Sequence, residues 1–267
     1  STISGMNAAD FPDVPQTTGR GSLDMPGEDF QKSLSQVLFA ASVDETRPIL
    51  TGVLFIFKKG SLTMVATDGF RLSQKKISLK GIDKAKKVII PKNALNELVR
   101  LAGDDEEIKF GLKKSDNQVI FGLDNITLSS RILEGEFPDF EKIIPKKSEY
   151  NVSVDKQELL RAVKLAAVFA RDSANIVRLK VKKKTMDVSA ESQQSGEQKT
   201  KLDVKVEGNT GKGFEIAFNY RFLEEFLNAI EGESVELRFS DPSDPGVFLD
   251  PKDKEYLHLI MPVKTQS

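Results

Sequence analysis

The segment VLFIFKKGSLTMVA at residues 53–66 reappears without a gap as VRLKVKKKTMDVSA at residues 177–190, an offset of 124 residues from 53 to 177. In both copies, apolar side chains alternate with other residues on either side of a short polar turn. This period of two is typical of a half-buried pair of antiparallel strands, with Lys59-Gly60 and Lys183-Lys184 at the turns. The chain is therefore predicted to contain two copies of one structural unit.

The patterns around the two hairpins agree as well. Apolar residues spaced at i, i+3, i+4 and i+7 precede the hairpins at Leu34–Ala41 and Leu159–Ala166, and follow them at Leu95–Ala102 and Leu223–Ile230. This spacing is typical of amphipathic helices packed on a core. Short alternating segments predict further strands at 107–112, 118–123, 126–132, 234–239, 245–249 and 256–261. We expect an α+β fold of tandem units, each with two helices packed on antiparallel sheets, joined edge to edge into an arc with the helices on one face.

A proline motif marks the ends of the units. Phe-Pro-Asp occurs at 11–13 and 137–139, and Met261-Pro262 lies near the end of the chain, so the prolines are 126 and 124 residues apart. This spacing predicts two complete units and the tail of a third. The expected divisions are 1–22 as the last strand of a preceding unit with a linker, 23–147 as a middle unit, and 148–267 as a C-terminal unit.

Polar segments interrupt the periodic ones. Residues 13–21 are predicted to form a linker, 146–150 a break between units, and 191–200 an exposed loop within a unit. The N-terminus lacks the charged and apolar regions of a signal peptide, and no stretch approaches the ~20 apolar residues of a membrane span. The sequence thus favours a cytoplasmic protein.

Composition argues against catalysis. Among 267 residues there are 39 basic and 40 acidic side chains, one histidine and no cysteine, for a net charge of -1. The missing cysteines exclude disulfides and thiolate chemistry, and the single His258 argues against a multi-histidine metal site or a Ser-His-Asp triad. No phosphate-binding glycine loop or nucleophile elbow is present. We therefore expect no enzyme activity, no metal and no cofactor.

Two residues still admit a catalytic interpretation. Asp68 precedes Gly69, and it is either the carboxylate of a hydrolase or, as we favour, part of a turn. His258 alternates with apolar neighbours, which is typical of a structural strand histidine.

Charge is distributed unevenly along the chain. Basic residues occur on the predicted helices, whereas acidic residues gather at 104–107 and 231–236. Such residues usually form plain solvated faces. Their separation also fits helices that face a polyanion, bound through phosphate contacts that are independent of sequence and weakened by salt.

Four motifs then carry a resemblance. ETRPILTGV at 45–53, VATDGFRL at 65–72, EFPD at 136–139 and IMPV at 260–263 resemble the bacterial DNA polymerase III beta subunit, the sliding clamp, over residues 3–264. The resemblance implies three similar domains per chain and a head-to-tail ring of two chains around duplex DNA. It also implies that this chain is a truncated form, in which residues 1–15 represent the last strand of the first domain.

The resemblance further implies a cleft between the middle and C-terminal domains, where partners dock a short linear peptide. Phe70 and Lys142 stand where several family members carry His and Arg, so pocket shape and ligand preference are expected to differ. The tail 265–267 is expected to cover or flank the cleft. The matching cleft positions are Leu50, Thr67, Gly69, Phe70, Arg71, Leu72, Pro138, Lys142, Ile143, Asn219, Phe222, Ser243, Leu259, Ile260, Met261 and Pro262.

DNA and dimer contacts are implied in the same way. Arg47, in the loop that matches a family DNA contact, is the first candidate. Val168 and Phe169 match the family's apolar dimer contacts, beside an edge at 196–201 that lacks the acidic residues of several relatives. Lys92, Arg100, Lys156, Arg161 and Lys164 are DNA-contact candidates by charge and side.

The expected function is that of a non-enzymatic processivity clamp. It would hold duplex DNA by topology and tether partners through the cleft, raising their effective concentration at DNA. The implied partners are duplex DNA, the DNA polymerase III alpha subunit, the clamp loader and other proteins with a clamp-binding motif, together with a second chain in the full-length ring. The alternative is a repeat-type protein-interaction scaffold without a DNA role.

Overall fold

The computed structural model describes residues 1–8, 17–19, 21–82, 84–103, 107–113, 116–208 and 213–264. Within them the helices are α1 (Gly27–Leu38), α2 (Lys92–Leu101), α3 (Lys156–Ala170) and α4 (Tyr220–Ala229), with short 3-10 turns at Pro48–Thr51 and Phe140–Ile143. The strands of the first half are β1 (Leu23–Met25), β2 (Gly52–Lys58), β3 (Ser61–Thr67), β4 (Arg71–Ser78), β5 (Lys86–Pro91), β6 (Ile108–Lys113), β7 (Gln118–Leu123) and β8 (Ile126–Arg131). Those of the second half are β9 (Tyr150–Asp155), β10 (Ile176–Val181), β11 (Thr185–Ser192), β12 (Gly196–Asp203), β13 (Lys205–Gly208), β14 (Phe214–Asn219), β15 (Ser234–Phe239), β16 (Gly246–Leu249) and β17 (Tyr256–Ile260).

The first unit packs α1 and α2 between two antiparallel groups of strands, β1-β6-β7-β8 and β4-β3-β2-β5. The apolar stripe of each helix faces the same core, where Phe30 of α1 and Leu98 of α2 are fully buried. Phe55, Phe57 and Phe110 supply aromatic contacts to it. The strand alternation read from the sequence thus directs one face of each strand onto the helices.

The second unit repeats this arrangement. Strands β12-β11-β10-β14 form one sheet, and β13-β9-β15-β16-β17 form the other group. Asp155 precedes helix α3 and caps it, because its Oδ1 accepts the backbone N–H of Glu158 at 2.8 Å. Helix α4 is capped in the same way by Asn219. The predicted α+β fold of two tandem units is confirmed.

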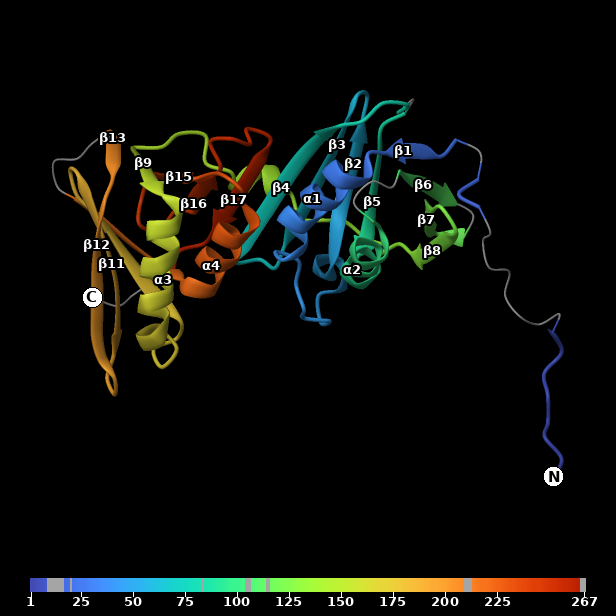
Figure 1. The fold of residues 1–267 in the computed structure, drawn as a ribbon, viewed down its shortest axis with the longest axis horizontal. Coiled ribbons are helices and arrows are strands. Elements are labelled where there is room, and N and C mark those ends of the chain that lie inside the picture. The colour runs from blue at the N-terminus through green and yellow to red at the C-terminus, as the bar shows by residue number, and fades with distance from the viewer. Residues whose placement is uncertain are drawn as a thin grey trace.

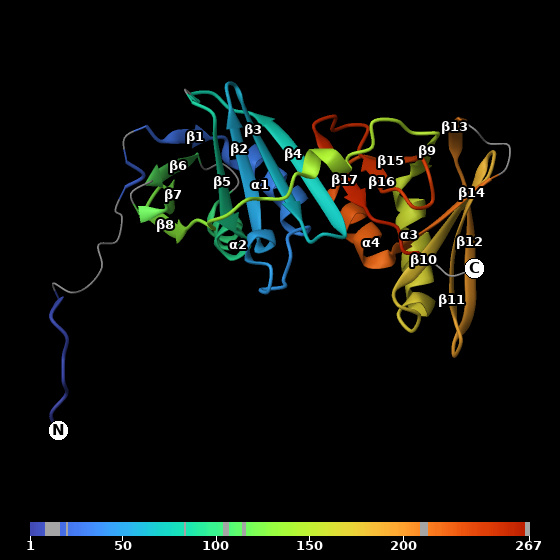
Figure 2. The same cartoon turned by 180° about the vertical axis from the view of Figure 1, so that it is seen from behind.

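The two units share one sheet. Strand β4 pairs antiparallel with β17, with Leu72 opposite Leu259, and this pairing joins the two groups into nine continuous strands. Figures 1 and 2 show the result as an elongated molecule with the β4–β17 seam near its middle. A separate apolar cluster that includes Leu72, Leu259 and Phe140 covers the seam on the face away from the helices.

The helices form a continuous row. Helix α1 contacts α2 within the first unit, α3 contacts α4 within the second, and α1 contacts α4 across the seam. In Figure 1 they lie along one side of the sheets. No helix in the described ranges is both long and apolar enough to cross a membrane.

One local prediction differs from the structure. The predicted loop at 191–200 is mostly strand, because β11 runs to Ser192 and β12 starts at Gly196. Its polar composition reflects an edge strand with one solvated face, and composition alone does not separate such a strand from a loop. Residues 1–8 have no strand assignment and extend away from the body in Figure 1, and the assignment of residues 1–22 to the end of a preceding unit stays a prediction. The first Phe-Pro-Asp motif at 11–13 and residues 104–106 of the acidic run lie outside the described residues.

Candidate functional site

Several of the predicted cleft residues, on the β3–β4 turn and at the end of β17, lie at one end of the β4–β17 seam. Thr67 Oγ1 donates to the carbonyl of Arg71 at 2.6 Å and accepts the N–H of Gly69 at 3.0 Å, which closes the β3–β4 turn. The N–H of Met261 donates to the carbonyl of Phe70 at 2.8 Å, so the chain leaving β17 stays attached to this turn. Two segments nearly 200 residues apart are thereby held side by side.

Asp68 has a structural role in this turn. Its Oδ1 accepts the N–H groups of Phe70 and Arg71 at 2.8 and 3.0 Å, and its Oδ2 lies 3.1 Å from Arg71 Nε. Both carboxylate oxygens are therefore engaged, as the turn interpretation predicts. No group of three or more metal-binding side chains occurs among the residues that the structure describes.

The apolar cleft residues divide into exposed and buried ones. Phe70 is 61% exposed, Ile143 43% and Met261 36%, so these three apolar side chains are accessible to a ligand. By contrast, the side chains expected to line the groove at Leu50, Leu72, Leu259 and Ile260 are buried in the core. The accessible apolar surface is therefore narrower than the sequence suggested.

The segment between the units borders this surface. The carbonyl of Pro138 accepts the N–H of Phe140 at 2.8 Å, which starts the 3-10 turn that presents Lys142 and Ile143. Exposed Lys142 lies 2.8 Å from Asp139, and this carboxylate raises the pKa of the ammonium group.

The C-terminal side of the cleft is polar at its edge. Asn219 is half-buried, and its Oδ1 accepts the N–H of Arg221 at 3.0 Å. Ser243 is exposed and lines a shallow pocket of about 440 Å³ with Val263, whose N–H donates to Ala217 at 2.8 Å. Pro262 lies between this pocket and Met261. The tail 265–267, expected to flank the cleft, lies outside the described residues.

Arg71 is the most heavily engaged residue of the set. Only 9% of its side chain is exposed, and it makes ion pairs with Asp68 and Glu225 and donates to the carbonyl of Phe39 at 2.7 Å. Its guanidinium carbon lies 4.5 Å from the ring centre of Phe222 and 5.3 Å from that of Phe39. Burial lowers the pKa of Arg71, and Asp68 opposes this shift. Arg71 thus links β4 and the end of α1 to α4.

The sequence contained little sign of this arrangement. Glu225 and Phe39 were not among the predicted site residues, and their separations from Arg71 are 154 and 32 residues. Phe39 lies within the predicted helical segment Leu34–Ala41, outside its apolar spacing, so the sequence held no signal for its contact with Arg71.

The predicted DNA contacts differ in availability. Lys92 is half-buried and donates to the carbonyl of Ala41 at 3.1 Å, and burial lowers its pKa. Lys156 is half-buried too and donates to the carbonyl of Ile230. Each of these two lysines donates to a carbonyl just beyond the end of a helix. Its ammonium group is therefore less available to DNA than that of a fully exposed lysine.

The other candidates are exposed. Arg100 pairs with Glu97 on the same helix turn, and Arg47 Nε lies 3.4 Å from Asp44. Arg161 donates to the carbonyl of Gln157 at 3.3 Å. Lys164 lies three residues further along α3. The row of helices therefore carries exposed basic residues. An exclusively acidic row would have favoured the scaffold without a DNA role, and that is not what the structure has.

The predicted dimer residues lie on α3 beside an open strand edge. Val168 is 59% exposed and Phe169 is half-buried against the core. Helix α3 contacts β12, which is the edge of its sheet. Leu165 is exposed on the same helix about one turn earlier and was not among the predicted dimer residues.

Comparison with known proteins gives a consistent picture. Residues 24–139 match the central domain of the DNA polymerase III beta subunit, and residues 141–264 match its C-terminal domain. The chain is 32% identical over 265 residues to the beta sliding clamp of Staphylococcus aureus strain Mu50, covering 98% of this chain and 69% of that protein. The beta sliding clamp of Staphylococcus epidermidis is 30% identical over 264 residues, with the same two coverages.

Solved structures agree. The DNA polymerase sliding clamp of Bacillus subtilis superposes with a TM-score of 0.90 at 30% identity, covering 98% of this chain and 69% of that one. The DNA polymerase III beta chain of Streptococcus pneumoniae superposes with a TM-score of 0.89 at 29% identity, covering 98% and 70%.

Proposed function

This chain belongs to the DNA polymerase III beta subunit family and has the function of a DNA sliding clamp; we propose that it performs this function without catalysis, by facing duplex DNA with its row of helices and binding linear peptides at the β4–β17 seam. The observation that supports the peptide site best is the group of exposed apolar side chains at Phe70, Ile143 and Met261. Phe70 and Met261 are themselves joined by a backbone hydrogen bond between the two units, and Ile143 lies on the segment that connects the units. A methionine at such a surface adapts to ligands of different shape.

The buried members of the predicted set support the exposed ones. Leu72 and Leu259 face each other across the seam, so they hold Phe70 and Met261 in place. Asn219, by capping α4, positions Phe222 beside Arg71. We assign direct peptide contact to Phe70, Lys142, Ile143, Met261, Pro262 and Ser243, and a supporting role to Leu50, Thr67, Gly69, Arg71, Leu72, Pro138, Asn219, Phe222, Leu259 and Ile260.

A labelled peptide tests the cleft. Fluorescence anisotropy with a C-terminal peptide of the DNA polymerase III alpha subunit should show saturable binding that Met261→Asp weakens at least about tenfold, since a charge would replace an apolar contact. Ile126→Asp is the matched control, because Ile126 is equally exposed but lies on β8. Equal binding by the wild type and Met261→Asp would show that the cleft is misplaced. Leu72→Asp is a poorer probe, since a charge in the core would unfold the unit.

We propose that DNA contact comes mainly from Arg47, Arg100, Arg161 and Lys164, with Lys92 and Lys156 contributing less because their side chains are engaged in the fold. Such contacts are electrostatic, so binding should fall steeply with salt. Removing both Arg161 and Lys164 by substitution to Gln should reduce the salt slope by about two. An unchanged slope would exclude α3 from the DNA-facing surface.

We propose that the second chain of the ring docks against α3 and β12, with Val168, Phe169 and Leu165 as the apolar part of the contact. An open strand edge beside exposed apolar residues supports this choice. We place the domain boundaries after residues 22 and 147. We also propose that the partners are the polymerase alpha subunit and the clamp loader, and that the protein acts in the bacterial cytoplasm. A sizing measurement on the full three-domain chain tests the interface, because in a head-to-tail ring this face would meet the first domain of the second chain. Val168→Asp should shift that chain from dimer to monomer, and an unchanged association state at every concentration would contradict the interface.

A further inference from the structure

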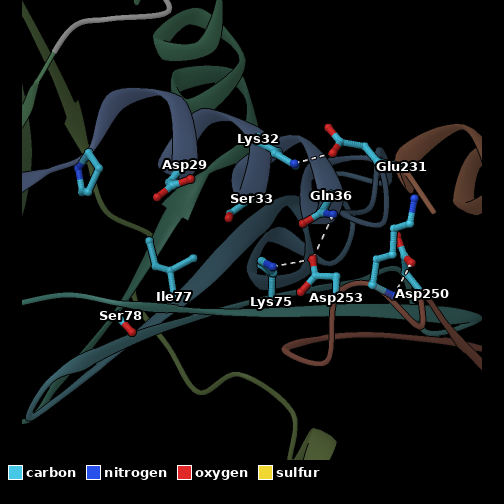
Figure 3. A pocket seen from close by; sticks show the side chains of 12 residues that line it. Asp29, Lys32, Ser33, Gln36, Lys75, Ile77, Ser78, Glu231, Asp250 and Asp253 are labelled. Carbon is cyan, nitrogen blue, oxygen red and sulfur yellow. Dashed lines mark hydrogen bonds and ion pairs between the residues drawn. The ribbon is translucent and has the colours of Figure 1, made fainter.

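A second pocket lies at the other end of the β4–β17 seam, on the side of α1 (Figure 3). Its volume is about 400 Å³, within the range of small-ligand sites. Helix α1 and β4 form one wall, and residues of the second unit form the other. The lining side chains from the second unit are Glu231, Asp250, Lys252 and Asp253. A ligand bound here would therefore contact both units at once.

The cationic groups near the centre of the pocket are already paired. Lys75 Nζ lies 2.5 Å from Asp253 Oδ2, and Lys32 makes an ion pair with Glu231. Both pairs cross from the first unit to the second. Asp250 is buried, and its two oxygens accept the backbone N–H groups of Gly232 and Lys252 at 3.0 and 2.9 Å. The pocket is therefore not suited to an anion, because carboxylates already neutralise the charges of Lys32 and Lys75.

An acceptor, in contrast, is left over. Gln36 of α1 is 3% exposed, and its Nε2 donates to Asp253 Oδ2 at 3.3 Å. This bond sets the orientation of the amide, since the flipped amide would bring two oxygens together. The Oε1 atom is buried and has no hydrogen-bond partner among the described residues. Figure 3 shows it turned away from Asp253, toward the space beside Ser33. A buried amide oxygen is normally hydrogen-bonded, so the pocket lacks a donor at this point.

The rim adds negative charge. Asp29 lies on α1 about two turns before Gln36, lines the same pocket and is exposed. Within the described part of the chain no hydrogen bond or ion pair engages its carboxylate, which acts on Lys32 of the same helix only through its charge. The lining holds four carboxylates, at Asp29, Glu231, Asp250 and Asp253, against three lysines, at Lys32, Lys75 and Lys252. A ligand that donates hydrogen bonds and carries positive charge meets both requirements.

We propose that this pocket binds an alkylammonium group, whose N–H donors bond to Gln36 Oε1 and whose charge is balanced by Asp29. The group is either one end of a free diamine or the side chain of a lysine presented by another protein. The chemistry at the pocket is the same in both cases. The site is independent of the peptide cleft, because it lies at the opposite end of the seam and shares none of its residues.

Calorimetric titration at constant ionic strength tests the proposal with two probes, 1,4-diaminobutane and Nα-acetyl-lysine methylamide. We expect saturable binding of at least one probe at one site per chain. Binding of the lysine derivative alone would indicate a lysine of another protein, and binding of the diamine alone would indicate a free diamine. Gln36→Leu removes the acceptor and should weaken binding at least about tenfold. Asp29→Asn, at an exposed position that does not disturb the core, should weaken it in the same direction.

Glu28→Gln is the matched control, since Glu28 is the neighbouring exposed carboxylate of α1 and does not line the pocket. Its affinity for the probe should equal that of the wild type. Heat that sodium chloride reproduces, a lack of saturation with both probes, or equal affinity in Asp29→Asn and the wild type would each overturn the proposal. The last comparison holds even if Gln36→Leu fails to fold.

Discussion

Replacing Arg71 by methionine is expected to weaken the link between the two units. The side chain is 9% exposed and connects Asp68, the carbonyl of Phe39 and Glu225. Methionine keeps much of the apolar volume between the rings of Phe39 and Phe222 but removes the charge. The substitution therefore isolates the polar contribution of the guanidinium group.

The size of the effect depends on how deeply the partners that lose the guanidinium group are buried. Breaking a buried ion pair by removing one partner costs about 3–5 kcal/mol. Glu225 is 46% exposed and becomes hydrated again, so its share is small, whereas Asp68 is 16% exposed and the Phe39 carbonyl loses a charged donor. We expect the lower end, about 3 kcal/mol. For a chain of this size that loss lowers Tm by about 6–12 °C.

Differential scanning calorimetry at neutral pH is the assay. Arg71→Lys should fall between the wild type and Arg71→Met, because lysine retains the charge but not the planar fork that reaches three acceptors. Arg161→Met is the control, since Arg161 is an exposed arginine on α3, and its Tm should change little. A shift below about 2 °C in Arg71→Met would refute the view that Arg71 holds the seam together.

Three further predictions concern stability. Burial lowers the pKa of His258 well below 6.5, so the unfolded state takes up the proton first, and the free energy of unfolding should fall as pH drops below about 6.5; in His258→Phe, urea titrations should show a weaker pH dependence across this range. A bond from Lys182 lowers the pKa of buried Asp187, so this carboxylate stabilises the fold above its unfolded pKa of about 3.9; Asp187→Asn should be less stable at pH 7, and the deficit should disappear as pH falls through the folded pKa. Asp155→Ala removes the cap of α3 and should cost about 1 kcal/mol in denaturant unfolding, while Asp155→Asn, which keeps an acceptor, should cost clearly less.

Much of the fold was predictable because its signals are local. The hairpin repeat located β2 with β3 and β10 with β11, and Gly60, at a φ of +78°, closes the first hairpin as its position in the motif required. The i, i+3, i+4 spacing located the four α-helices that the described residues form. The failure at 191–200 has a local cause as well, since an edge strand exposes one face to water and so has the composition of a loop.

The candidate site was less predictable, because it depends on which side chains the seam buries. The resemblance identified the positions around Phe70 and Met261, but not that Leu72 and Ile260 lie in the core while Phe70 projects into solvent. Burial at these positions is decided by pairing with a strand almost 190 residues away, which no periodicity within either segment records.

By itself, the sequence determined that this protein contains two copies of one α+β unit, with helices and strands at known places and without the residues for thiol or multi-histidine chemistry. Only the tertiary structure decided that Arg71 links α1 to α4, and that Gln36 is buried between the units with an oxygen that has no partner among the described residues. The physical reason is the range of the interactions. Strand and helix periods arise from neighbouring residues, whereas ion pairs and buried acceptors at the seam arise only when the two units are brought together.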